Sequence, residues 1–543
     1  MAAPNVLTTS MSSPPHRRPT TCYGPAERLQ KAYHISKWCL QRFAAISWQA
    51  STPINIASLI EHLAPHPDRN FVNALISGLQ DGFHTGVRNA PSSTFIGRNL
   101  LSARSQPQTV SELIDLKYAK GIYSARLSSH PLLTSAVVLS VSAEKKYSAK
   151  KRLIVDLSSP RNDPVTSSIN ELIDKEEFSL SYVKLDDAIA SILRLGKGSW
   201  LCKTDIVDAF KLIPIHPSLW HLYGIQWQGR FYFFVRLPFG SRSSPKIFDQ
   251  LSTAISWIAE KVYGIDTIFH LLDDFLTVDP PSFDANRTMA LLTLIFRRLA
   301  IPIAPHKTVG PTTCLEYLGI ELDTIKMQAR LPQEKLDRIL DLVASFLNCK
   351  SCTKRQLLSL LGHLTFACRV VVPGRTFISR LIELSKATQK LDFHITISSE
   401  SRLDLTMWHH FLASWNGISM FLDTSTTAAS DMELYTDASG IGHGGYFIGH
   451  WFQERWDSNL RLDSDPALSI AFQELYPIVI AALLWGHLWA RKRILFHCDN
   501  SATVHIINKG RSKSPIIMKL MRRLVLLAAT HHFMFHAEHI PGS

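Results

Sequence analysis

Three aspartates stand where apolar segments of the sequence end. Asp205 closes the run WLCKTD, and Asp273 and Asp274 are adjacent within IFHLLDDFLTV. Phosphoryl transfer between nucleotides needs two divalent cations about 3.5–4 Å apart, which activate the attacking oxygen and neutralise the leaving one. Magnesium prefers oxygen ligands, so aspartates at strand ends suit it. The pattern predicts a hairpin whose turn contains Asp273 and Asp274 and presents both carboxylates toward Asp205.

An ordinary turn is the competing interpretation of the adjacent aspartates, because aspartate is frequent in turns. Taken alone, that interpretation would be the stronger one. A second acidic strand end at Asp205, with a glycine-bearing loop between the two places, favours the metal site.

A second set of acids follows further along the chain. Asp437 ends a strand-like run in LYTDAS, Glu474 opens a helical stretch in FQELYPIVIAALLWGHLWA, and Asp499 follows the strand-like run ILFHC. A strand, a helix and a strand that each deliver one acid to a common point predict another two-metal phosphodiesterase site. Pro477 is expected in the first helical turn, where no internal amide donor is needed. Isolated capping or turn acids are the competing interpretation.

The periodicity of the whole chain predicts an α+β multidomain protein. Amphipathic helical patterns such as NIASLIEHL precede strand-like runs at 135–141 and 152–158, and a helix is expected at 184–196, ended by a glycine. The predicted parts are a disordered N-terminus at 1–24, a helical region of unknown role at 25–90, an α+β domain at 91–325, a helical region at 326–422, a linker at 423–431 and an α/β domain at 432–543.

Composition narrows the class of protein. Among 543 residues, 46% are hydrophobic and 19% charged, which is the balance of a folded chain, and the net charge of +13 suggests a polyanion partner or a generally basic surface. No run of about eighteen uncharged apolar residues occurs, so no membrane partner is expected. The scattered cysteines, without a secretory signal, predict an intracellular protein with free thiols; Cys349 and Cys352 alone make a weak zinc site.

The first acidic set lies within phrases that resemble the reverse transcriptase family. They are DIVDAF (205–210), LPFGSRSSPKIF (237–248), HLLDD (270–274) and HKTVGPTTCLEYLGIEL (306–322). Leu271 departs from the aromatic residue of many relatives, but it is not a metal ligand. The resemblance implies a right-hand polymerase of fingers, palm and thumb, with two Mg²⁺ ions, or Mn²⁺ in their place, held by Asp205, Asp273 and Asp274.

The same resemblance implies a set of nucleotide-binding residues. Asp208 would lie under the triphosphate, and the ring of Phe210 would occupy the space that a ribose 2′-hydroxyl needs, unless it only fills the core. Gly240 would let the backbone approach the template and the incoming nucleotide. Lys307 would act as a general acid or charge clamp, with a solvated lysine as the equal alternative. In EKKYSAKKR (144–152), a basic finger or a solvated charge run, the residues that match a triphosphate grip are Lys145, Lys146 and Arg152.

The second acidic set, Asp437, Glu474 and Asp499, resembles the metal ligands of the ribonuclease H family, which cuts the RNA strand of an RNA–DNA hybrid. A fourth acid is expected after the segment HFMFHAEHIPGS but does not occur in the sequence, so the domain is predicted to be incomplete at its C-terminus and its activity is in doubt. GIGHGG (440–445) matches a dinucleotide-binding pattern, but YFIGHWF reads as a strand, so a hairpin turn is expected there.

Further phrases resemble DIRS-like and Ngaro-like retrotransposons. The implied function is an RNA-directed DNA polymerase with an attached ribonuclease H-like α/β domain. Its partners would be an RNA template, a DNA primer, the RNA–DNA hybrid and deoxynucleoside triphosphates, with a tyrosine recombinase encoded elsewhere. A relic that binds nucleic acid without catalysis and a template-independent nucleotidyltransferase are the alternatives. The phrases lie at 357–384, 469–479 and 496–515.

Overall fold

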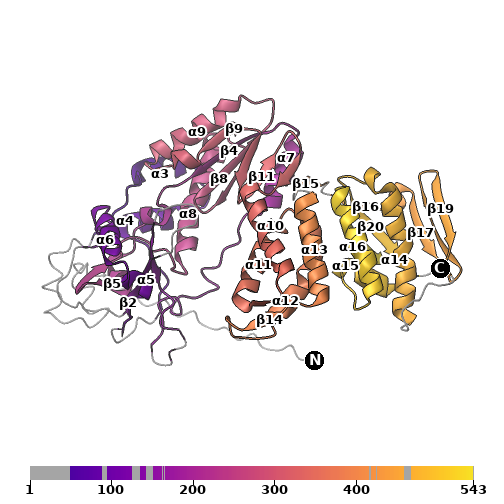
Figure 1. The fold of residues 1–543 in the computed structure, drawn as a ribbon. Coiled ribbons are helices and arrows are strands. Elements are labelled where there is room, and N and C mark those ends of the chain that lie inside the picture. Colours follow the sequence, from indigo (N-terminus) through magenta and orange to yellow (C-terminus); the bar gives the residue numbers. More distant parts are fainter. Residues whose placement is uncertain are drawn as a thin grey trace, which may run out of the picture. The chain divides into compact units, whose positions relative to one another are not determined.

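The computed structural model describes residues 49–88, 95–124, 135–141, 151–161, 163, 166–414, 418–422, 425–457 and 466–541 (Figure 1). The chain divides into two compact units. The first unit contains Met1–Leu180, Asp208–Ala254 and Leu299–Ile301, and the second contains Ser181–Val207, Ile255–Arg298 and Pro302–Ser543. The division passes through the predicted 91–325 region and through the motif DIVDAF itself, whose first three residues belong to the second unit and whose last three belong to the first.

The first unit begins with helices whose starts are fixed by capping side chains. The carboxamide of Asn55 accepts a hydrogen bond from Ser58 N–H, and Asp68 does the same for Phe71 N–H. The helical pattern predicted for NIASLIEHL is therefore confirmed as α3, and a second helix follows it. The helices are α3 (Ile56–Leu63), α4 (Arg69–Asp81), α5 (Leu101–Arg104) and α6 (Pro107–Ala119).

One mixed sheet forms the rest of the first unit. Its central strand β2 pairs in parallel with β1 and β5 and antiparallel with β3, and β5 and β6 form a hairpin. The strands predicted at 135–141 and 152–158 are confirmed. The strands are β1 (Phe95–Ile96), β2 (Ser135–Val141), β3 (Leu153–Asp156), β5 (Gly224–Trp227) and β6 (Arg230–Phe233). Two 3-10 helices, η1 (Ala209–Leu212) and η2 (Pro217–Tyr223), precede β5. Helix α8 (Ser244–Trp257) starts in this unit.

An antiparallel sheet of the order β7-β8-β4-β9 is the part of the second unit that carries the first acidic set. Its two inner strands bury Leu201, Leu276 and Val278. The predicted helix at 184–196 is confirmed as α7, which ends at Gly196 with a φ of 102°. The elements are α7 (Leu185–Leu195), β4 (Trp200–Asp205), β7 (Ile268–Leu271), β8 (Asp274–Asp279), α9 (Ala285–Arg298) and β9 (Val309–Thr312). A short π-helical stretch, Ile258–Val262, and η4 (Pro305–Lys307) connect them.

A second antiparallel sheet and four helices follow, and they make one core with the helices of the C-terminal part. The helical character predicted for 326–422 is confirmed, with short strands added. The helices are α10 (Gln333–Asn348), α11 (Lys354–Ala367), α12 (Ser379–Ser385) and α13 (Ser399–Ser414). The strands are β10 (Cys314–Tyr317), β11 (Ile320–Asp323), β12 (Gln328–Arg330), β13 (Ser351–Thr353), β14 (His394–Thr396) and β15 (Ile418–Met420).

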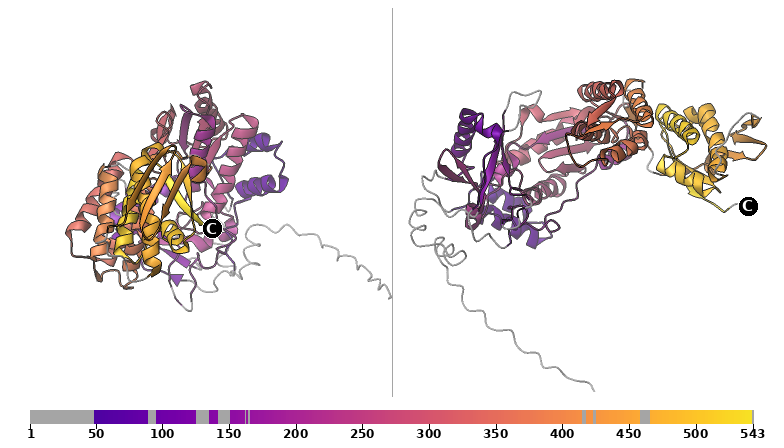
Figure 2. Two further views of the ribbon diagram at one scale, coloured as in Figure 1. Left: turned by 90° about the vertical axis from the view of Figure 1, so that its right-hand side faces the viewer. Right: turned by 60° about the horizontal axis from the view of Figure 1, so that its bottom comes forward.

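The C-terminal part contains a parallel sheet, β16-β20-β21, and an antiparallel sheet, β17-β18-β19. Figures 1 and 2 show α14 and α16 packed beside these strands. The strands are β16 (Thr427–Ala428), β17 (Leu434–Ala438), β18 (Gly442–Phe447), β19 (His450–Arg455), β20 (Arg493–Cys498) and β21 (Met534–His539). The helices are α14 (Pro466–Trp485), α15 (Ser501–Lys509) and α16 (Pro515–Thr530).

This part differs from the sequence predictions in three places. Thr427 and Ala428, expected in a linker, pair in parallel with Ile494 and Leu495. Pro477 lies inside α14, not in its first turn, because the helix begins at Pro466; Glu474 is likewise an interior residue. GIGHGG supplies the predicted hairpin turn between β17 and β18, but its last four residues belong to β18, where a Cβ on Gly442 would lie 2.4 Å from the carbonyl oxygen of Glu454. These glycines therefore serve close strand packing, and no helix follows them.

Among the described residues, Ser469–Leu488 is long and apolar enough to cross a membrane by length and composition, which differs from the expectation above. Of that window, 56% is buried within the fold, and it contains Glu474. The core helix of a folded domain has the same length and composition.

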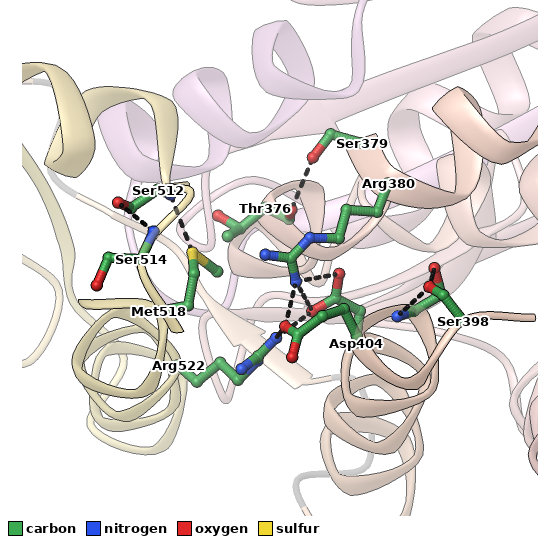
Figure 3. A network of polar contacts seen from close by, with 11 residues as sticks. Thr376, Ser379, Arg380, Ser398, Asp404, Ser512, Ser514, Met518 and Arg522 are labelled. Carbon is green, nitrogen blue, oxygen red and sulfur yellow. Dashed lines mark hydrogen bonds and ion pairs between the residues drawn. The ribbon is translucent and has the colours of Figure 1, made fainter. Parts of the chain in front are cut away.

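A buried ion cluster joins α12, α13 and α16 (Figure 3). Asp404 is 1% exposed and accepts hydrogen bonds from Arg522 at 3.0 Å and from Arg380 at 3.3 Å. Both guanidinium groups also reach Glu400, at 3.1 and 3.2 Å. Burial raises the pKa of Asp404, and the two arginines oppose that shift. We call these four residues the Asp404 cluster.

Candidate active sites

The register of two strands brings the first acidic set together. β4 and β8 are antiparallel, and Asp205 is directly opposite Asp274 in their ladder. Residues in this relationship have Cβ atoms about 4.5–5.5 Å apart. The backbone N–H of Ile206 donates to the carbonyl oxygen of Asp273 at 3.0 Å, so the third aspartate is also held beside the end of β4. The structure thus brings the three aspartates to one place.

The turn between β7 and β8 differs slightly from the prediction. Leu271 pairs with Asp274, so the two-residue turn consists of Leu272 and Asp273, and Asp274 is the first residue of β8. Leu272 has a φ of 55°, in the left-handed region. Two-residue hairpin turns favour such angles and usually place glycine or asparagine there. A leucine in this conformation is uncommon, and backbone strain of this kind is concentrated at functional sites.

Crowded carboxylates shape the electrostatics of this site. Asp205 is 6% exposed. Burial raises the pKa of Asp273, as do the neighbouring Asp205 and Asp274; Lys307 opposes the shift. Burial also raises the pKa of Asp274, which Lys203 lowers. Negative charge is thus poorly compensated here, and a set of carboxylate oxygens at one point suits a hard divalent cation such as Mg²⁺. The residues fit the predicted ions.

Two lysines approach the three aspartates. Lys307 Nζ donates to Asp205 Oδ2 at 2.6 Å, and Lys203 Nζ lies 3.6 Å from Asp274 Oδ1. Lys307 is held close because Ala304 N–H donates to the carbonyl oxygen of Asp205 at 2.8 Å. Lys203 was not predicted. It stands two residues before Asp205 in β4, and residues two apart in a strand share a face, so the alternation was a usable signal.

The other residues of the DIVDAF motif lie in the first unit. Asp208 has a φ of 53° and forms an ion pair with Lys120 at 2.8 Å, a partner that the sequence did not reveal. Phe210 is 8% exposed, and its ring centroid lies 4.8 Å from that of Phe239 and 5.6 Å from that of Phe248. The burial is compatible with both interpretations of Phe210, a core ring and a ring beneath the sugar.

Gly240 has the conformation that its predicted role requires. Its φ is 93°, and a Cβ there would lie 3.0 Å from the carbonyl oxygen of Val155. Asn170 donates to the carbonyl oxygen of Gly240 at 2.8 Å. Arg152 directly precedes β3 and is exposed. Lys145 and Lys146 lie outside the described residues.

The second acidic set is brought together at the end of β20. Ligand atoms of Glu474, Cys498 and Asp499 all lie within 4.8 Å of one another. Burial raises the pKa of Glu474 to about 7, and Asp499 and then Asp437 add to the shift, so all three predicted acids interact. Cys498 is a member that the prediction missed. Cys498 is the buried last residue of β20, and Asp499, which follows it, is exposed. Because successive residues of a strand point to opposite faces, the sequence did not indicate that these two side chains lie close together.

A match to a protein family covers the part of the chain that contains the first site. Residues 146–322 match the family described as Reverse transcriptase (RNA-dependent DNA polymerase). This range includes the metal-binding candidates Asp205, Asp273 and Asp274. It also includes Asp208, Phe210, Gly240 and Lys307. The acids of the second site lie beyond it.

A curated relative is "Protein P" of Duck hepatitis B virus (strain China), which is 27% identical over 120 residues. The match covers 22% of this chain and 15% of that protein.

Two solved structures of a foamy viral protease-reverse transcriptase are also similar. The one in complex with double-stranded DNA, titled dRH, has a TM-score of 0.46 and 15% identity, and the match covers 98% of this chain and 85% of that chain. The one in complex with an RNA/DNA hybrid has a TM-score of 0.48 and 12% identity, with 98% and 66% covered.

Proposed function

We propose that this chain, which carries a reverse transcriptase domain over residues 146–322, is an RNA-directed DNA polymerase that adds deoxynucleotides to a primer 3′-hydroxyl. One observation carries the proposal. Asp205 faces Asp274 across the β4–β8 ladder, with Asp273 in the adjoining turn, inside the family-matched range. We further propose that these carboxylates hold two Mg²⁺ ions, and that the partners are an RNA template, a DNA primer and deoxynucleoside triphosphates.

The residues of the chain would divide the work as follows. When bound, the two cations would activate the primer hydroxyl and neutralise the charge of the leaving pyrophosphate. Asp205, Asp273 and Asp274 would hold them, since their crowding and the raised pKa values of Asp273 and Asp274 favour binding of positive charge. Lys307, which pairs with Asp205 here, would be free to meet the phosphates once cations replace it. A ring at Phe210 would exclude a 2′-hydroxyl.

The direct test is primer extension on poly-rA/oligo-dT with Mg²⁺. We expect Asp273→Asn to lower extension by at least roughly 10³-fold, which corresponds to about 4 kcal/mol of barrier. Asp279→Asn is the matched control, because Asp279 is also a buried aspartate of β8 with a raised pKa but lies at the opposite end of the strand, facing Trp200. Near-normal extension by Asp273→Asn, or an equal loss in both variants, would remove the proposed site.

We also propose that the C-terminal part cleaves the RNA strand of an RNA–DNA hybrid through Asp437, Glu474 and Asp499. The support is the closeness of Glu474 and Asp499 and the raised pKa of Glu474, to which Asp437 also contributes. A hybrid with labelled RNA, incubated with wild type and Asp499→Asn, tests this. Cleavage by wild type alone supports the proposal, whereas equal traces in both variants would reject it without affecting the polymerase.

The source of the chain is part of the same proposal. The phrases at 357–384 and 496–515 support a DIRS-like or Ngaro-like retrotransposon, acting inside the cell beside a separately encoded tyrosine recombinase. A nucleic-acid-binding relic is the alternative function. Wild-type protein that binds the primer–template but does not extend it would favour the relic.

A further inference from the structure

Lys211 is a buried ammonium group in the first unit, directly after Phe210 in the chain. It is 8% exposed, and its Nζ donates to the carbonyl oxygen of Leu237 at 2.8 Å. Burying a charged group is costly unless it has partners. An apolar side chain of similar length would fill the same volume without that cost. The lysine therefore calls for an explanation beyond packing.

The partners of Lys211 connect it to the ring of Phe210. The Nζ atom lies 5.0 Å from the ring centroid of Phe239, a distance at which an ammonium is attracted to an aromatic face. The Phe239 ring in turn lies 4.8 Å from that of Phe210. Phe239 is 58% exposed, so little else confines it. A short series of contacts thus runs from the ammonium through the exposed ring to the buried one.

The same lysine holds one end of the segment that carries Phe239. Lys211 binds the carbonyl oxygen of Leu237, and Ser244 Oγ donates to that of Pro238 at 2.9 Å. At the other end, Asn170 binds the carbonyl oxygen of Gly240 at 2.8 Å. Phe239 lies between these anchors, so its backbone is fixed and its ring position depends on Phe210 and on the ammonium.

We propose that Lys211 is a positioning residue for sugar selection: it holds Phe239 against Phe210, so that discrimination against ribonucleotides depends on the ammonium. The inference rests on the proposed polymerase function. Lys211 itself would touch neither the nucleotide nor the metal ions. Its effect passes through the two rings.

The test compares single-nucleotide incorporation of a deoxynucleotide and its ribonucleotide by the full chain, with kcat and KM measured for each. The assays are run below pH 7, because burial lowers the pKa of Lys211 to about 7 and the ammonium form is needed. We expect Lys211→Met to lower the selectivity ratio, which is kcat/KM for the deoxynucleotide divided by kcat/KM for the ribonucleotide, by about tenfold or more. The main cause should be a lower KM for the ribonucleotide. Lys211→Arg keeps the cation and should restore most of the ratio. A change in folding alone would lower both activities and leave their ratio unchanged.

Arg236→Met is the matched control. Arg236 is 8% exposed and donates to the carbonyl oxygens of Lys211 and Leu212 at 3.2 and 3.4 Å, so it is an equally buried cation on the same backbone. Its removal should leave the selectivity ratio within about twofold, because no interaction of its own with either ring supports selection.

Phe239→Leu is the second variant, for the case that Lys211→Met is insoluble. Phe239 is exposed, and its replacement by leucine removes the ring that contacts both Lys211 and Phe210. It should lower the ratio as Lys211→Met does. An unchanged ratio in Lys211→Met, or in Phe239→Leu where the first variant cannot be made, would overturn the inference. Absence of extension by wild type would instead overturn the proposed function.

Discussion

The ammonium of Lys307 lies 2.6 Å from Oδ2 of Asp205, so a lysine predicted from its sequence phrase meets the first predicted metal ligand directly. Lys307 is half exposed, while the Asp205 side chain is 9% exposed. A cation beside a buried carboxylate competes with any other cation for the same oxygen. This contact makes the role of Lys307 testable.

Lys307→Met should lower the maximal extension rate by about 10²-fold if the lysine acts as a general acid toward the leaving group. It should also lower the Mg²⁺ concentration for half-maximal activity, because the competing ammonium is gone. Both follow from one Mg²⁺ titration. Lys261→Met, which removes an exposed lysine paired with Glu260, is the control. An unchanged extension rate in Lys307→Met would show that Lys307 pairs with Asp205 but takes no part in catalysis.

Phe210→Val separates the two interpretations of the buried ring. A ring beneath the sugar predicts that ribonucleotide incorporation relative to deoxynucleotide incorporation rises by at least about tenfold. A ring that only fills the core predicts a loss of stability without that rise. Phe248→Val is the comparison, because Phe248 is fully buried and touches Phe210. Equal ribonucleotide incorporation in the two variants would argue for the core interpretation.

The buried lysine of the first unit predicts a pH-dependent stability. Burial lowers the pKa of Lys211 to about 7; the nearby Lys117 adds to this and Asp208 opposes it. The unfolded chain keeps a lysine pKa of about 10.4, so above pH 7 it binds more protons than the folded chain. Stability therefore rises with pH between 7 and 10, by at most about 1.4 kcal/mol per unit for one group.

Urea unfolding of wild type and Lys211→Met at pH 7 and pH 9 measures this effect. The wild type should gain stability relative to the variant on going to pH 9. Lys117, whose pKa burial lowers to about 8, is present in both proteins, so its own titration contributes to both pH profiles. Parallel pH profiles would show that Lys211 is charged at neutral pH in the folded protein.

Glu474 predicts that stability falls as pH rises, which is the opposite of the effect of Lys211. Its pKa of about 7 lies above the value for an unfolded glutamate, so its contribution to stability is lost as pH rises from about 4 to 7. A metal ion needs the carboxylate form. The Mn²⁺ or Mg²⁺ concentration that half-saturates hybrid cleavage should therefore rise by up to about tenfold per pH unit below 7.

Glu474→Gln should abolish the cleavage and, in metal titrations followed by calorimetry, remove the pH dependence of binding. Glu454→Gln is a suitable control, since Glu454 is an exposed glutamate of the same part of the chain. Metal binding that is independent of pH in wild type would contradict the assignment of Glu474 as a ligand.

Local sequence patterns predicted many residues of the candidate active site, but not the pairing between distant strands that brings them together. The apolar flanks of Asp273 and Asp274 predicted the hairpin, but the pairing of Asp205 with Asp274 depends on a register between distant strands that no local pattern encodes. β16 has two residues and therefore no periodicity to detect. The prediction placed the start of this helix at Glu474, whereas α14 begins at Pro466. Lys120 could be found only from the neighbouring element that it contacts, whereas the alternation within β4 was a usable signal for Lys203.

The Asp404 cluster also determines how the C-terminal part can vary. Because Arg522 of α16 is held by Asp404 and Glu400 of α13, side-chain charge fixes that helix independently of the covalent link between α13 and β16. A protease cut in that link would leave the two fragments associated. Neutralising Asp404 would leave Glu400 as the carboxylate shared by Arg380 and Arg522 and would weaken this association.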